Sequence, residues 1–186
     1  MGFQHPTTSP ESPSLGRDKA SYLAHWKPSL HSICQTQLEL ELPKMKPEDV
    51  HAKLEEGRRH LHFIIGLYRL QVDQGRHFLH EHPQSAMSWK DDWMQDLLRH
   101  PRVKTTVSDQ CEYGLVTWTN DGGIAAAKKP TRWATTSDQM IQRLSKRCSG
   151  KHRHEPLLAG RAAHAAFYHL PRITEILRGV RDTSEI

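Results

Sequence analysis

The sequence lacks long apolar runs, closely spaced cysteines and an apolar leader. No run in its 186 residues approaches the roughly 18 apolar residues of a membrane-spanning helix. The first 15 residues are rich in Pro, Ser and Thr, so a secretory signal is not expected. Cys34, Cys111 and Cys148 are odd in number and far apart, which excludes a disulfide framework and a CxxC zinc ribbon. We therefore expect an intracellular protein, nuclear or cytoplasmic, without a membrane partner.

Basic residues are concentrated in one segment. The formal net charge is +5, but residues 128–153 alone hold eight Lys or Arg residues against Asp138. Such a segment attracts phosphates, so we predict weak, electrostatic, salt-sensitive binding of nucleic acid. The residues expected to carry it are Lys128, Lys129, Thr131, Arg132, Lys151 and Arg153. The alternative is a solvated basic face without a partner.

The order of hydrophobic patterns predicts an α/β fold. Residues 1–18 resemble a disordered tail, 19–46 form a poorly defined leader, and 47–182 form the folded domain. A helical period covers residues 47–74, and short strand-like segments follow near 76–81, 103–107, 115–119 and 133–135. Ser88 and Ser137 can cap further helices, and residues 160–168 and 171–180 are predicted helical. Helices that alternate with strands indicate half of a doubly wound, partly Rossmann-like sheet, with a long N-terminal helix and a helical C-terminus.

Residue spacing predicts which side chains share a face in one strand and in one helix. Period two puts His80 and His82 on one face of their strand and Glu81 on the other. A carboxylate that emerges from an apolar strand could handle protons, so Glu81 is the candidate catalytic residue; a structural strand end is the alternative. Trp89, Trp93 and Leu97 share helical spacing and are expected in the core.

An ordered series of short motifs resembles a known family. Glu81-His82-Pro83, Ser88-Trp89, residues 109–114 (DQCEYG), residues 128–131 (KKPT) and residues 135–137 (TTS) follow one another. The series is similar to protist and fungal sequences of copia-type retrotransposon polyproteins, over about residues 60–180. The resemblance implies that the chain is a polyprotein segment, with the rest of that polyprotein as a candidate partner. No protease, reverse-transcriptase or integrase motif of such polyproteins is present.

The same series also resembles the second half of a cytosine-5 DNA methyltransferase. There, a Glu at a strand end holds the flipped cytosine, and a later basic motif contacts DNA. The resemblance places Glu81 in the first role and Lys128, Lys129 and Arg132 in the second. The sequence shows no glycine-rich turn for S-adenosylmethionine before residue 76 and no Pro-Cys nucleophile. We therefore expect no cofactor and no activity from this chain alone; a partner that supplies the cofactor half would restore an enzyme.

Cysteine and histidine also cluster late in the chain. Cys148, His152 and His154 could supply three zinc ligands, with Cys111 or His164 as a fourth. The spacing matches no common zinc pattern and the neighbours are basic, so no metal is assigned from the sequence. The carboxylates of Asp109 and Glu112 disfavour Cys111 as a nucleophile. The leading prediction is a non-catalytic, nucleic-acid-associated domain; the alternatives are the completed methyltransferase-like enzyme and a plain protein-interaction domain.

Overall fold

The computed structural model describes residues 46–158, 161, 165 and 169–184. The predicted tail at residues 1–18 lies outside this part, as do the predicted leader up to residue 45 and most of the predicted helix at 160–168. The elements are α2 (Pro47–Asp73), β1 (Leu79–Pro83), η3 (Met87–Lys90), α3 (Asp92–Leu98), β2 (Lys104–Asp109), η4 (Gln110–Tyr113), β3 (Val116–Trp118), β4 (Ile124–Ala126), β5 (Pro130–Thr135), α4 (Asp138–Arg143) and α6 (Leu170–Ser184). No helix within the described ranges is long and apolar enough to cross a membrane.

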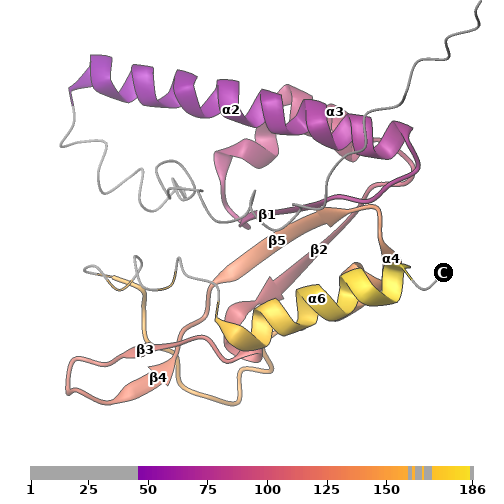
Figure 1. Ribbon diagram of the computed structural model, residues 1–186. Helices are drawn as coiled ribbons and strands as arrows, with labels where there is room; N and C mark the ends of the chain where they lie inside the picture. Colours follow the sequence, from indigo (N-terminus) through magenta and orange to yellow (C-terminus); the bar gives the residue numbers. More distant parts are fainter. Residues whose placement is uncertain (1–45, 159–160, 162–164, 166–168, 185–186) are drawn as a thin grey trace, which may run out of the picture.

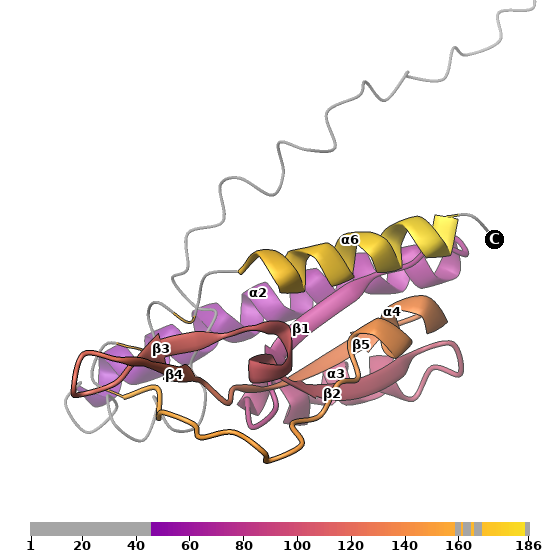
Figure 2. The ribbon, with the colours of Figure 1, turned by 90° about the horizontal axis from the view of Figure 1, so that it is seen from below.

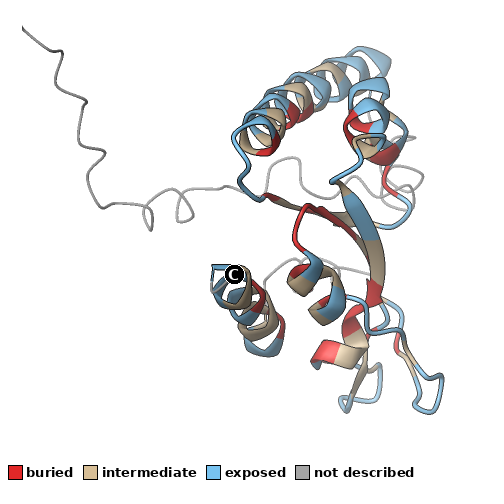
Figure 3. Ribbon diagram, turned by 90° about the vertical axis from the view of Figure 1, so that its right-hand side faces the viewer, coloured by how far each residue is buried: buried red, intermediate tan, exposed pale blue. Residues whose placement is uncertain are grey.

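A three-stranded sheet separates two helical layers. The strand order is β1-β5-β2, and a separate hairpin pairs β3 with β4. Helices α2 and α3 cover one face of the sheet, and α4 and α6 cover the other (Figures 1 and 3). The hairpin projects beyond one end of the sheet (Figure 2). The prediction of a mixed helix and sheet domain with a long first helix and a C-terminal helix is confirmed.

The sheet register differs from that of a purely parallel sheet. β1 and β2 both pair antiparallel with β5, and Trp133 lies opposite Glu81 on one side and Thr106 on the other. The two outer strands therefore run parallel to each other, and the chain passes from one to the other through α3. The local patterns that predicted the strands carry no information on this pairing, because it depends on contacts between distant segments.

The central strand β5 divides the core between the two faces. Trp133, which is 1% exposed, packs with Tyr113, Met140 and Leu144 under α4 and α6. Its neighbour Ala134 points to the opposite face, where the large buried residues are Ile65, Phe78, Trp89, Met94 and Leu97. This alternation follows from the period of two along a strand. Residues 133 and 134 are apolar within the basic segment because β5 is buried on both of its faces at this point.

The boundaries confirm some local predictions and correct others. α2 begins at Pro47 and is followed by Gly75 at φ +73°, as the sequence predicts. Ser137 caps α4 by accepting a hydrogen bond from the amide of Met140 at 3.2 Å. Ser88, by contrast, is not the cap of α3: Asp91 has that role and accepts from the amide of Trp93 at 3.0 Å.

The prediction that Trp93 is a core residue is wrong. A 3-10 turn (η3) precedes α3, and the extended backbone of Asp91 separates the two. This break shifts the helical phase, so that Trp89 is 3% exposed but Trp93 is 47% exposed. Met94 and Leu97 form the buried side of α3 instead.

Candidate functional site

Four cysteine and histidine side chains that could hold a metal ion meet at one end of the sheet. Cys111 lies in η4 directly after β2, while Cys148, His152 and His154 follow α4. One ligand atom from each of these residues lies within 4.8 Å of the others, and we call them the Cys/His cluster. The sequence alone assigns no metal and leaves the fourth partner open between Cys111 and His164. Among the described residues the partner is Cys111; His164 lies outside them.

The segment that carries the three later members is held by backbone contacts. The amide of Asp109 donates to the carbonyl of Lys146 at 3.0 Å, and the amide of Gln110 donates to that of Lys129 at 3.2 Å. His154 forms a parallel bridge with Ala126, the last residue of β4. These bonds join the turn after β2, the chain before β5 and the segment after α4. They bring together residues that are far apart in the sequence.

Asp109 and Gly150 orient Cys148. The Asp109 side chain is 1% exposed and accepts a hydrogen bond from the Cys148 amide at 2.9 Å. The Gly150 amide donates to Cys148 Sγ at 3.3 Å, and its φ of +73° suits glycine. Hydrogen bonds of this kind fix the direction of a sulfur ligand before any metal binds.

The environment of Cys111 disfavours a reactive thiolate. Burial raises the pKa of its thiol to about 11, with further contributions from the Cys148 thiol and from Asp109 and Glu112. A thiol with a raised pKa is protonated at neutral pH and is a weak nucleophile. This agrees with the interpretation of Cys111 as a non-catalytic residue.

The basic residues predicted to bind nucleic acid occupy different environments. Lys128 and Lys151 are exposed, and the Arg153 side chain is 80% exposed and 3.9 Å from Glu155. Lys129 is half-buried and donates to the carbonyl of Ala165 at 3.0 Å. These residues flank the Cys/His cluster in sequence or through the backbone hydrogen bonds.

Two members of the predicted set lie in the central strand. Thr131 is completely buried, and its hydroxyl donates to the carbonyl of Lys129 at 3.2 Å. A buried side chain cannot contact a nucleic acid at the surface, so Thr131 is not part of the proposed phosphate site. The Arg132 guanidinium lies 4.7 Å from the centre of the Trp89 ring. Both residues are placed in this way because β5 lies between two other strands. The basic composition of the surrounding segment gave no indication of a central strand.

Two further cations of the basic segment, Lys146 and Arg147, were not among the residues predicted to bind nucleic acid. Lys146 and Arg147 are exposed and directly precede Cys148. Arg147 pairs with Asp109 at 3.2 Å, and the Lys146 ammonium lies 5.3 Å from the centre of the Tyr113 ring. The sequence signal that could have identified them is their position within the basic segment 128–153. We call residues 127–129 and 145–153 together the basic loops.

Glu81 lies in the middle of β1, on the face opposite the two histidines. Its carboxylate is 3.4 Å from the guanidinium of Arg172 in α6, whose side chain is 2% exposed. On the other face, His80 Nδ1 hydrogen-bonds the Tyr68 hydroxyl at 3.2 Å, and His82 hydrogen-bonds Ser88. The predicted alternation of these three side chains is therefore present, and Glu81 is part of an ion pair that joins the sheet to α6.

No protein-family model, curated protein or solved structure matches this chain. The functional assignment therefore depends on the arrangement of the side chains themselves.

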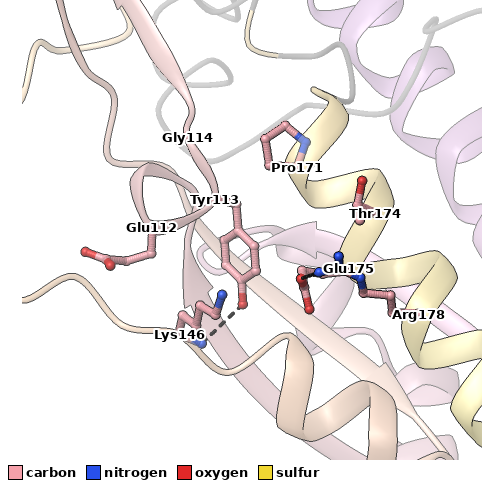
Figure 4. Close-up of a pocket in the computed structure, with 8 residues that line it drawn as sticks. All are labelled: Glu112, Tyr113, Gly114, Lys146, Pro171, Thr174, Glu175 and Arg178. Carbon is pink, nitrogen blue, oxygen red and sulfur yellow. Dashed lines mark hydrogen bonds and ion pairs between the residues drawn. The ribbon is translucent and has the colours of Figure 1, made fainter.

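A pocket of about 390 Å³ lies beside the cluster, between η4 and α6 (Figure 4). Its charged lining residues already have partners: Glu175 pairs with Arg178 at 2.8 Å and with Arg143 at 3.0 Å. Glu112 accepts from the Ser149 amide at 3.4 Å. The Tyr113 hydroxyl accepts from the Lys146 amide at 3.2 Å. These contacts give the pocket wall a structural role in joining η4 to α6.

Proposed function

We propose that this protein is a non-catalytic, nucleic-acid-associated domain that binds phosphates through its basic loops. The observation that carries the proposal is the convergence of two separate stretches of basic residues beside the Cys/His cluster. Lys128 comes from the chain before β5, and Lys151 and Arg153 come from the segment after α4. The bridge between Ala126 and His154 supports their proximity.

The chemistry of these side chains suits backbone binding rather than base reading. They are long, exposed and positively charged, and they lie on loops instead of a helix that could enter a groove. Phosphate contacts of this kind depend strongly on salt and little on sequence. The proposed ligand is therefore a nucleic acid recognised through its phosphates, and the proposed affinity is weak and electrostatic.

A charge-reversal triple variant tests this proposal. We expect Lys128→Glu with Lys151→Glu and Arg153→Glu to weaken binding of a fluorescent duplex across all sequences. The slope of log affinity against log salt should fall by about 0.9 for each phosphate that the variant no longer neutralises. The measurement is a fluorescence anisotropy titration at several salt concentrations.

The matched control carries the same change in net charge on other elements. Lys53, Arg59 and Lys90 are exposed on α2 and η3, away from the basic loops. Their replacement by Glu should leave most of the salt slope intact. Equal losses in the two triple variants, or a wild-type affinity that does not fall as salt rises, would show that the basic loops are not a phosphate site.

We also propose that the body of the domain is half of a doubly wound fold, similar to the second half of a cytosine-5 DNA methyltransferase. Two features support this. The path from β1 through α3 to β2 joins two parallel strands through a helix, and helices lie on both faces of the sheet. The central strand β5 lies between these two strands and pairs antiparallel with both, unlike the mostly parallel strands of a doubly wound sheet. An origin in a retroelement-type polyprotein stays a prediction.

The methyltransferase-like enzyme is the second candidate function, and Glu81 would handle the base in it. Against a catalytic role in this chain, Glu81 is already engaged by the buried Arg172 guanidinium. We therefore expect calorimetry to detect no binding of S-adenosylmethionine to the purified chain. A measurable heat of binding would favour the enzyme over the non-catalytic domain.

A further inference from the structure

We propose that the Cys/His cluster is a structural zinc site, with Cys111, Cys148, His152 and His154 as its four ligands. This inference does not depend on the proposed binding of nucleic acid. It begins from the positions of the ligand atoms, which all lie within 4.8 Å of one another. Two of the three cysteines in the chain take part.

The two distances from Cys148 to the histidines match those around a tetrahedral zinc ion. Zn–S bonds of about 2.3 Å and Zn–N bonds of about 2.0–2.1 Å place sulfur and nitrogen ligands about 3.6 Å apart. Cys148 Sγ lies 3.5 Å from His152 Nε2 and 3.4 Å from His154 Nε2. Both histidines thus direct the same ring nitrogen at one sulfur, as two ligands of a common ion would.

The donor set selects the metal. Two thiolates and two imidazoles in a tetrahedral arrangement favour Zn²⁺, whereas Mg²⁺ and Ca²⁺ require oxygen ligands. Four protein ligands complete the coordination and leave no open position for water or substrate. The chemistry is therefore that of a structural site, not of a catalytic one.

The basic surroundings are compatible with such a site. When Zn²⁺ binds, the two thiol protons are released to solvent and the imidazoles coordinate in their neutral form. A Zn²⁺ ion with two thiolates has no net charge, so nearby cations are not repelled by the completed centre. Arg147 is also paired with the buried Asp109, and the Arg153 side chain is directed largely into solvent.

The ion would tie together segments that are distant in the sequence. Cys111 follows the edge strand β2, whereas the other ligands follow α4, after β3, β4 and β5 have intervened. A metal cross-link over so long a stretch stabilises the folded state, because the unfolded chain holds no preformed site. Asp109 and Gly150 provide the hydrogen bonds that orient Cys148 for this role.

The first test is the metal content of the full-length protein. We expect protein produced with added zinc to retain one Zn²⁺ per chain after gel filtration, measured by elemental analysis. Replacement of Zn²⁺ by Co²⁺ should give the visible absorption of a tetrahedral site and a thiolate-to-metal charge-transfer band. A zinc-free protein that binds neither ion, or one in which Cys111 and Cys148 form a disulfide under reducing conditions, would overturn the proposal.

Ligand variants locate the site. We expect Cys111→Ser, Cys148→Ser and His154→Gln each to weaken zinc affinity by at least about 100-fold, since even the loss of an outer hydrogen bond costs 10–100-fold. The matched controls are Cys34→Ser and His51→Gln, which should retain one Zn²⁺. Retention of full affinity by the ligand variants, or its loss in the controls, would contradict the assignment. Because the wild-type Co²⁺ spectrum reports thiolate ligation directly, the proposal stays testable even if a variant does not fold.

Discussion

Replacement of Trp133 by alanine is expected to lower the free energy of unfolding by about 3–5 kcal/mol. Trp133 is 1% exposed in the central strand, and its indole N–H donates to Ser108 Oγ at 2.7 Å, also within the core. The substitution removes the largest fully buried side chain among the described residues and deprives a buried hydroxyl of its indole donor. Chemical denaturation followed by circular dichroism measures the effect.

Two further variants make this expectation specific. Trp133→Phe keeps most of the packing and loses the hydrogen bond, so its cost should be clearly smaller. Trp93→Ala removes a tryptophan that is 47% exposed, and it should cost less than about 1 kcal/mol. Equal costs for Trp133→Ala and Trp93→Ala would contradict the placement of β5 at the centre of the sheet.

The same substitution is expected to weaken the Cys/His cluster. Tyr113 belongs to the hydrophobic cluster of Trp133 and lies in η4, two residues after Cys111. Loss of the tryptophan removes packing beneath this turn, so zinc affinity should fall together with stability. The core and the candidate site are in this sense parts of one unit.

The ion pair between Glu81 and Arg172 carries the second large effect. Glu81→Gln removes the carboxylate charge that lies 3.4 Å from the guanidinium of Arg172, whose side chain is 2% exposed. Loss of one member of a buried pair costs about 3–5 kcal/mol because the remaining charge stays desolvated. We expect a decrease of about 3 kcal/mol in the free energy of unfolding, measured by urea denaturation.

A double variant distinguishes the loss of this charge pairing from a general loss of packing. Glu81→Gln combined with Arg172→Met removes both charges, so it should be more stable than Glu81→Gln alone. The exposed pair of Arg99 and Asp96 provides the control, and Arg99→Gln should cost less than about 1 kcal/mol. Wild-type stability of Glu81→Gln would show that this ion pair does not hold α6 to the sheet.

The local elements could be predicted because their signals lie in neighbouring residues. The helical period and Gly75 identify α2, and Ser137 identifies the start of α4. The break at Asp91 could not be predicted, since a continuous i, i+4 pattern runs through Trp89 and Trp93. The pairing of β5 between β1 and β2 depends on contacts between distant segments, which a local pattern does not contain.

The candidate site could be predicted only in part, because some of its ligands are neighbours in the sequence and one is distant. Cys148, His152 and His154 lie close together in the sequence and were identifiable as possible ligands. Selection of Cys111 as their partner required the folded arrangement of η4 and the segment after α4. Likewise, the burial of Thr131 became visible only once β5 was placed in the middle of the sheet.

The most direct test of the account is the affinity for nucleic acid measured on one protein sample with zinc, after chelation and after zinc is restored. The proposed zinc ion would tie the segment that carries Lys151 and Arg153 to η4, so metal removal should loosen the positions of these charges. We predict that affinity and salt slope both fall on chelation and return with Zn²⁺. The same affinity and salt slope at all three stages would contradict the account.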